Sequence, residues 1–408
     1  MGDSGREQLS REDRFARARG VAVRAAREWI ASTDDGPTVE ALSGPPHRII
    51  ALGDPQTRLD TFLAVLDRAE LLSDEGRLIP DVALISLGDH FDWGRRTERL
   101  EATEEAILLL AWLASHPANQ VTILLGNHDL ARVCELAPFD LERFRDAQRE
   151  ADLAYDSGDP RRTAEFKRRY PEIPDSEVLA RDLATFSLEQ RVLVAHLLRR
   201  GRFRIAQAAA PNVLCLHGAV AHDDLALLGL PHESMSSAEL VAERLNAELD
   251  DAVNRWAATF SEESLASGIP QLDLGALHRP ADGESEGRGI FYQRPTHPLA
   301  ARPELFVGPP RRRFDPRTLP LGLTQVVGHI RDKKARELLG AWTDHRRPSD
   351  GLIRHLVTDG RAVRYAFGLP PTASGHPRAT LIFADAGMNF VPPERYPLLD
   401  LTSGIVEF

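Results

Sequence analysis

The stretch VTILLGNHD, residues 121–129, joins a largely apolar run of five residues to a cluster of polar side chains. Such a run, ended by a glycine, predicts a buried β-strand that stops at Gly126. Four more short runs have the same form: RIIALGD (48–54), DVALISLGD (81–89), NVLCLHG (212–218) and TQVVGH (324–329). Helix-periodic segments such as 59–72 and 103–114 separate the first three runs, so the pattern predicts an α/β fold assembled from βαβ units.

The composition of the chain limits the kinds of molecule that it is expected to bind. The chain has 408 residues and a formal net charge of -11, which argues against nucleic acid or an anionic membrane as the main partner. Its two cysteines, Cys134 and Cys215, are interpreted as free thiols in a reducing compartment. Because no apolar signal core and no run near ~20 apolar residues is present, we expect a cytoplasmic protein without a membrane partner. The oligomeric state stays open.

The chain divides into an expected N-terminal helical extension, residues 1–44, and a main domain, residues 45–408. Apolar residues at helical spacing predict a helix over 11–31 that packs on the body of the protein. Two charged, helix-periodic stretches, at about 135–205 and 233–285, are interpreted as insertions that form a helical cap over the site.

Polar side chains follow each predicted strand, at the place where open α/β sheets bind ligands. They are Asp54 and Gln56, Asp89 and Asp92, Asn127 with His128 and Asp129, then His217, then His329. A single Gly-Asp or a lone histidine is weak evidence, because turns and structural histidines are common. The ordered set of carboxylate, amide and imidazole donors suits two adjacent divalent metals of the manganese, iron or zinc type, with one bridging carboxylate.

In this order the motifs resemble those of the calcineurin-like metallophosphoesterase superfamily: Asp-x-His, Gly-Asp-x-x-Asp, Gly-Asn-His-Asp/Glu, His and Gly-His. The resemblance covers roughly residues 47–390. The stretches CLHGAV, VVGH and FADAGMN look closest to the phosphoprotein-phosphatase-like branch, which includes the Shewanella-like phosphatases. The resemblance implies a four-layer α/β sandwich of two mixed β-sheets flanked by helices, with the site at the strand ends.

The resemblance also implies two divalent metal ions as cofactors, with manganese favoured over iron, zinc and magnesium. The first ion would be held by Asp54, Gln56 and Asp89, and the second by Asp89, Asn127, His217 and His329. Asp89 would bridge the ions, and a hydroxide between them would attack phosphorus in line.

The same resemblance assigns the acid of the reaction. His128 would protonate the leaving oxygen, Asp129 would hold its tautomer, and Asp92 would orient a ligand or water. His90 receives no role, because neighbours at a strand end point to opposite sides. Histidines outside the motifs, His278 among them, receive none either.

Gln56 departs from the family pattern, which has histidine at this position. Its side-chain oxygen can bind a metal as a neutral donor that is harder than imidazole, which predicts a weaker first ion of the magnesium or manganese type. The alternative is that Gln56 only hydrogen-bonds to nearby groups and that the first ion is lost.

Phosphate binding is the second departure. The branch has Asp-Arg-Gly where this chain has Asp-Trp-Gly at 92–94, followed by Arg95 and Arg96. Either arginine is a candidate to bind the phosphate, as is Arg294 in GIFYQR, and for each a solvated surface position is the alternative. The arginine-rich stretch at 309–314 is interpreted as a solvated loop or a contact at the rim.

Together these features predict a two-metal phosphoester hydrolase acting on a phosphoprotein or a small phosphomonoester. A phosphodiesterase for nucleotides or RNA ends is the alternative enzyme, favoured by arginine-rich insertions and disfavoured by the net charge. A degenerate binding module with the same fold is the non-enzymatic alternative, although the intact GNHD motif disfavours it.

Overall fold

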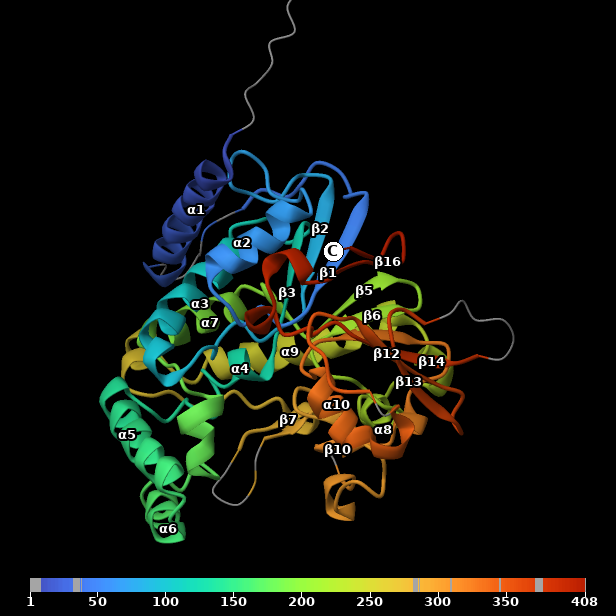
Figure 1. The fold of residues 1–408 in the computed structure, drawn as a ribbon. Helices are drawn as coiled ribbons and strands as arrows, with labels where there is room; N and C mark the ends of the chain where they lie inside the picture. The colour runs from blue at the N-terminus through green and yellow to red at the C-terminus, as the bar shows by residue number, and fades with distance from the viewer. Residues whose placement is uncertain are drawn as a thin grey trace, which may run out of the picture.

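The computed structural model describes residues 9–31, 37, 39–281, 285, 287–308, 310–344, 346–370 and 377–407. Within them, two six-stranded mixed sheets are flanked by helices (Figure 1). The first sheet has the order β16 (Ile405–Glu407), β15 (Leu398–Asp400), β1 (Arg48–Leu52), β2 (Val82–Ser86), β3 (Val121–Leu124), β4 (Phe203–Arg204). The second has the order β13 (Val363–Phe367), β12 (Arg354–Thr358), β14 (Ala379–Phe383), β11 (Thr324–Val327), β6 (Val213–Leu216), β5 (Ala206–Ala210). This architecture confirms the predicted fold class.

Parallel pairing brings the ends of the central strands to a common edge. β1, β2 and β3 are parallel neighbours in the first sheet, and β6, β11 and β14 are parallel neighbours in the second. All five sequence runs that predicted strands form strands within these two groups. Because the carboxyl ends of parallel strands lie at one edge, the polar residues that follow them are collected there.

Two small ladders lie outside the main sheets. β7 (His278–Arg279) pairs antiparallel with β8 (Arg288–Gly289), and β9 (Arg294–Pro295) pairs parallel with β10 (Arg313–Phe314). They hold the chain between β6 and β11 near the strand ends that carry the polar residues.

The helices are α1 (Arg11–Ala31), α2 (Leu59–Arg68), α3 (Arg99–Ala114), α4 (Asn127–Leu130), α5 (Leu141–Ser157), α6 (Pro160–Arg169), α7 (Leu188–Arg199), α8 (His222–Leu227), α9 (Ala238–Ala257) and α10 (Asp332–Leu339). The helix predicted over 11–31 is α1, which packs on α3 and α7 and buries Ala18, Ala22, Ala25 and Trp29. No helix of the described residues is both long enough and apolar enough to cross a membrane.

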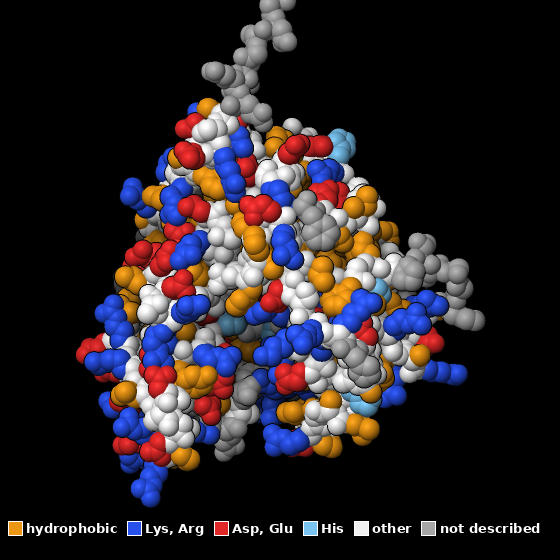
Figure 2. All heavy atoms as spheres, in the orientation of Figure 1, with side chains coloured by type: hydrophobic (Ala, Val, Ile, Leu, Met, Phe, Trp, Pro, Cys, Tyr) orange, Lys and Arg blue, Asp and Glu red, His pale blue; other side chains and the backbone are white. Residues whose placement is uncertain are grey.

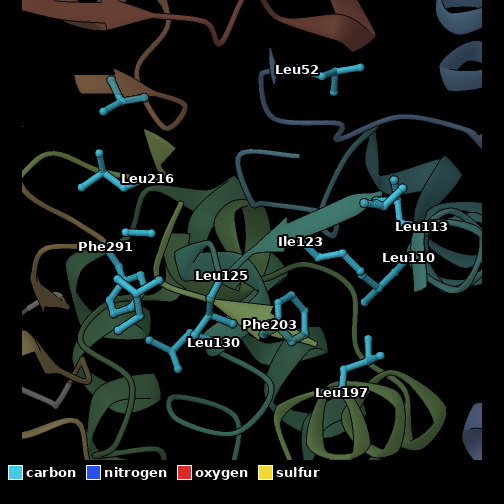
Figure 3. Close-up of a cluster of buried hydrophobic side chains, with 14 of the residues drawn as sticks. Leu52, Leu110, Leu113, Ile123, Leu125, Leu130, Leu197, Phe203, Leu216 and Phe291 are labelled. Atoms are coloured by element: carbon cyan, nitrogen blue, oxygen red, sulfur yellow. The ribbon is translucent and has the colours of Figure 1, made fainter. Parts of the chain in front are cut away.

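Each sheet buries apolar side chains on both of its faces. One buried cluster contains side chains of both sheets, including Ala51 and Ile85 of the first and Val326 and Ile382 of the second. In a larger cluster, the side chains at the alternate strand positions pack against the helices. In Figure 3, Ile123 of β3 lies beside Leu110 of α3. Burial of each such side chain stabilises the fold by about 1.5–3 kcal/mol.

The first predicted insertion is shorter than expected. α5, α6 and the π-helix Val178–Asp182 form a unit with its own core, which includes Phe144, Phe166 and Phe186, and α5 and α6 project from the body in Figure 1. α7 instead packs in the main core, and β4 completes the first sheet. The limit at residue 205 was wrong because an amphipathic helix has the same period whether it covers a sheet or forms a cap.

The second predicted insertion does not form a cap over most of its length. α9 packs on β5 and β6, and its apolar residues such as Leu245, Leu249 and Val253 join the main core. The part of this insertion that lies toward the strand ends is its last part, from β7 onward. α9 is therefore a flanking layer of the second sheet.

Candidate metal centre

Five polar side chains from five strand ends lie close together. Asp89 Oδ2 is 3.3 Å from His217 Nε2, and Asn127 Oδ1 is 3.1 Å from the same nitrogen. Asp54 Oδ1 is 3.8 Å from His217 Nδ1. Asp89, His217 and His329 each offer one ligand atom, and these atoms lie within 4.8 Å of one another. The structure thus collects the predicted carboxylate, amide and imidazole donors in one place.

Backbone carbonyls orient both imidazoles. His217 Nδ1 is 2.7 Å from the carbonyl oxygen of Leu87, which only accepts, so Nδ1 carries the proton and Nε2 presents its lone pair. His329 Nε2 is 3.3 Å from the carbonyl oxygen of Tyr292, which by the same argument leaves Nδ1 as the ligand atom. Such a partner fixes the ring that a metal binds.

Strained backbone is concentrated at this edge. Four described residues other than glycine have positive φ, and three of them are Asp89 (56°), Asp92 (62°) and His329 (62°). Conformations of this kind cost about 1–3 kcal/mol each and persist at functional sites. Neighbouring glycines make room: a Cβ on Gly328 would lie 2.0 Å from Asp54 Oδ1. The local backbone is therefore built around the carboxylates.

The carboxylates of Asp54 and Asp89 are buried, and burial opposes their ionisation. Burial raises the pKa of Asp54 well above its usual value, and the nearby Asp385 and Asp89 carboxylates raise it further. Burial also opposes ionisation of Asp89, but the His217 and His128 imidazoles outweigh it and lower its pKa. The pKa of His329 is lowered well below its usual value by burial, then by Arg294 and His217. A neutral imidazole beside carboxylates is the form that binds a cation.

Gln56 lies beside this cluster in a fixed orientation. Its Nε2 donates to the carbonyl oxygen of Phe91 at 2.8 Å and to that of Asp92 at 3.2 Å. Both amide hydrogens are therefore engaged, and Oε1 is the end that remains available as a ligand. The local hydrogen bonds and a ligand role are compatible, so the ligand role of Gln56 stays a prediction.

His128 is oriented by Asp92. Its Nδ1 lies 2.9 Å from Asp92 Oδ2, and its Nε2 lies 3.8 Å from Asp89 Oδ2. Burial lowers the pKa of His128, but Asp89 and Asp92 outweigh it and raise the pKa to about 9. Asp92 is held in turn by Arg132 Nη1 at 2.8 Å and by the amide and hydroxyl of Thr185, each at 2.8 Å.

The prediction that Asp129 holds the tautomer of His128 is wrong. Asp129 accepts from the backbone amides of Asp89 and His90 at 3.0 Å and from that of Gly126 at 2.9 Å. It also lies 3.0 Å from His90 Nδ1. Since His90 Nε2 is 2.9 Å from Ser86 Oγ, that ring points away from the metal ligands. Asp129 joins the loops after β2 and β3.

A cavity of about 160 Å³ opens beside these residues. Asn127 and His128 line it on one side, and Pro174, Val178, Asp182 and Leu183 of the first insertion line it on another. Figure 2 shows a hollow near the centre of this face, with histidine atoms at its floor and lysine and arginine side chains around it. The first insertion therefore contributes part of the lining of the cavity, and its role as a cap stays a prediction.

A family model for calcineurin-like phosphoesterases matches residues 47–273, more than half of the chain. The chain belongs to the calcineurin-like phosphoesterase family. Among solved structures, a cold-active protein tyrosine phosphatase is similar with a TM-score of 0.38 and 14% sequence identity, over 98% of this chain and 82% of that chain. No curated protein matches.

As a calcineurin-like phosphoesterase, the chain is a metal-dependent phosphoester hydrolase. Members of the family normally bind divalent metals, and the donors fit such ions: two buried carboxylates, an amide oxygen and two imidazoles with oriented lone pairs. The buried carboxylates also need a cation to offset their mutual repulsion.

The arginines of this phosphoesterase lie differently from the prediction. Arg96 forms ion pairs with Asp156 at 2.6 Å and Asp152 at 3.2 Å on α5, and Arg95 is exposed, so neither lines the cavity. Arg294 does line the cavity, and its buried Nε has no hydrogen-bond partner in the part of the chain that the structure describes. Of the three predicted arginines, only Arg294 is brought to the site.

Two residues of the site were missed. Arg312 also lines the cavity, and burial lowers its pKa to about 10, so the stretch interpreted as a solvated loop is partly buried. Asp385 follows β14 and is buried within electrostatic reach of Asp54 and Asp89. A signal for Asp385 was present, because it follows the largely apolar run ATLIFA (379–384) as the other acids follow theirs.

Proposed function

We propose that this chain is a dinuclear phosphomonoesterase that acts on small phosphorylated metabolites. The observation that carries the proposal is the arrangement of Asp89, His217 and His329 within 4.8 Å of one another, beside the His128–Asp92 pair. A cavity of about 160 Å³, walled by the first insertion, favours a small phosphomonoester over a segment of a folded phosphoprotein.

Asp89 is central to the proposed metal binding. Asp54, Gln56 and Asp89 would hold one ion, and Asp89, Asn127, His217 and His329 the other. Bound divalent ions supply charge neutralisation at the phosphate and activate water as the nucleophile. Asp89 has its Oδ1 occupied by the His128 amide at 2.9 Å and its Oδ2 directed toward His217, which fixes the carboxylate before any ligand binds.

His128 and Arg294 act on the substrate in this proposal. His128 donates a proton from Nε2 to the leaving oxygen, since Nδ1 is bonded to Asp92 and the Asp89 and Asp92 carboxylates raise the pKa of the ring. Arg294, whose Nε is buried and has no hydrogen-bond partner among the described residues, donates to the phosphate oxygens. Burial excludes water and strengthens both interactions.

The test is hydrolysis of a panel of small phosphomonoesters, phosphopeptides, phosphodiesters and dinucleoside polyphosphates, each with manganese, magnesium, iron and zinc. Native protein should prefer small monoesters. Asp89→Asn should lose hydrolysis together with the metal bound at the Asp89, His217 and His329 centre, whereas Asp81→Asn, an exposed acid before the same strand, should retain both. A preference for diesters, or an active and metal-loaded Asp89→Asn variant, would refute the proposal.

A further inference from the structure

A second group of potential metal ligands lies beside the cavity. Cys134, Glu135 and His278 each offer one ligand atom, and these atoms lie within 4.8 Å of one another. All three are buried, with exposed fractions of 0%, 1% and 2%. Cys134 and Glu135 follow α4, whereas His278 begins β7, so the group joins segments separated by more than a hundred residues.

Three polar atoms of this group are unsatisfied, whereas the Cys134 thiol donates to the carbonyl oxygen of Leu272 at 3.3 Å. Neither ring nitrogen of His278 has a hydrogen-bond partner within the described ranges, and the same holds for Glu135 Oε2. The other carboxylate oxygen, Glu135 Oε1, accepts from the Tyr292 hydroxyl at 2.7 Å and from the Ala281 amide at 3.3 Å. Buried polar atoms without partners are rare and costly, so these three atoms require an explanation.

A simple ion pair between Glu135 and His278 does not explain them. The shortest separation, from His278 Nε2 to Glu135 Oε1, is 3.6 Å, which is too long for a hydrogen bond. Two ligand atoms bound at ~2.1 Å to one tetrahedral ion lie about 3.4 Å apart. The observed spacing therefore resembles that of neighbouring ligands around an ion.

We infer that Cys134, Glu135 and His278 form a zinc-type metal site, separate from the catalytic metal centre. Sulfur, nitrogen and carboxylate oxygen from three residues are a donor set suited to Zn²⁺, with a fourth position for a solvent oxygen. Solvent can enter because Glu135 also lines the cavity. Binding would deprotonate Cys134 and release that proton to solvent.

The site would brace the wall of the catalytic cavity. Tyr292 donates its hydroxyl to Glu135, stacks on His278 at a ring distance of 5.7 Å, and offers its carbonyl to His329 Nε2. An ion at Glu135 and His278 would therefore fix the segment that orients His329 and precedes Arg294. It would also join the root of the first insertion to β7.

Cobalt is the probe for this site, because a thiolate ligand gives Co²⁺ a strong near-ultraviolet charge-transfer band and oxygen or nitrogen ligands alone do not. Native protein, titrated with Co²⁺ after metal removal, should develop this band. Cys134→Ala should lose the band and bind one Co²⁺ fewer per chain, and His278→Gln should weaken or lose it. Cys215→Ala removes the other buried thiol and should keep the band.

Asp89→Asn separates this inference from the proposed function, because it should lose catalytic metal and keep the band. The spectrum of the native protein is decisive even if a core variant fails to fold. Absence of the band in cobalt-loaded native protein would overturn the inference. An equal metal count in native protein and in a folded Cys134→Ala variant, checked by circular dichroism, would also overturn it.

Discussion

His128 Nδ1 lies 2.9 Å from Asp92 Oδ2, and the two residues come from the ends of different strands. The carboxylate next to His128 in the sequence, Asp129, is bonded to three backbone amides instead. The imidazole is thus oriented across the β2–β3 edge, with Arg132 holding the carboxylate from behind.

Asp92→Asn should slow hydrolysis by about 10²-fold or more, because His128 loses the charge that orients and protonates it. The decrease in kcat of Asp92→Asn should be larger for an alkyl phosphate than for an aryl phosphate, whose leaving oxygen needs no proton.

Asp129→Asn should instead reduce the free energy of unfolding by about 1–3 kcal/mol, because the contacts of Asp129 with the backbone amides weaken. Measurement of kcat for both substrates distinguishes the two acids, and an equal leaving-group dependence in both variants would contradict the assignment.

Gln56→His and Gln56→Ala test the first metal ion. If Oε1 is a ligand, the Ala variant should bind metal more weakly than native protein. The His variant should bind it more tightly, with a shift from magnesium or manganese toward zinc or iron. Metal content per chain after dialysis against each ion provides the measurement. Equal content in native protein and Gln56→Ala would show that Gln56 only hydrogen-bonds to Phe91 and Asp92.

Arg294→Ala should lower kcat/KM by about 10²-fold, since a charge-assisted hydrogen bond to phosphate contributes about 1.5–3 kcal/mol. Arg96→Ala should change it by less than about 2-fold, because Arg96 is paired with acids of α5. Steady-state kinetics on one monoester compares the two. The reverse order of effects would place the phosphate near η1 (Arg96–Glu98) rather than near β9.

His116 should make stability depend on pH. Burial lowers its pKa from 6.5 to about 3, and its Nε2 accepts from the Leu78 amide at 3.0 Å, which requires a neutral ring. As the pH falls, His116 therefore binds a proton in the unfolded chain before it does so in the folded chain. The contribution of His116 to the free energy of unfolding is complete above pH 6.5 and falls by about 1.4 kcal/mol per pH unit toward pH 3. Urea unfolding at pH 7 and pH 5 should show a smaller loss for His116→Gln than for native protein. His47→Gln, at an exposed position, should behave as native protein does.

The parts of the site that depend on strand order could be predicted from the sequence. Asp54, Asp89, Asn127, His217 and His329 each follow a run of apolar residues, and parallel strands necessarily bring such positions together. The partners of side chains could not be predicted in the same way. Asp92 reaches His128 from a backbone of positive φ, and no local sequence pattern specifies that conformation.

Long-range packing decided the other differences. Arg96 was a candidate for phosphate because of its position in the motif, yet its nearest acids come from α5, some sixty residues later. α7 and α9 have the same amphipathic pattern as a cap, but only the tertiary structure determines what their apolar faces cover. The family resemblance supplied the order of the ligands and not these contacts.

The donors of the metal centre are divided by chemistry between the two sheets. The strands of the first sheet supply oxygen donors through Asp54, Asp89 and Asn127, and those of the second supply nitrogen donors through His217 and His329. Because the ribosome synthesises the chain from its N-terminus, the last of these oxygen donors, Asn127, emerges about two hundred residues before His329. A nascent chain therefore has no complete transition-metal site, and the enzyme acquires its full ligand set only after β11 has been synthesised and packed.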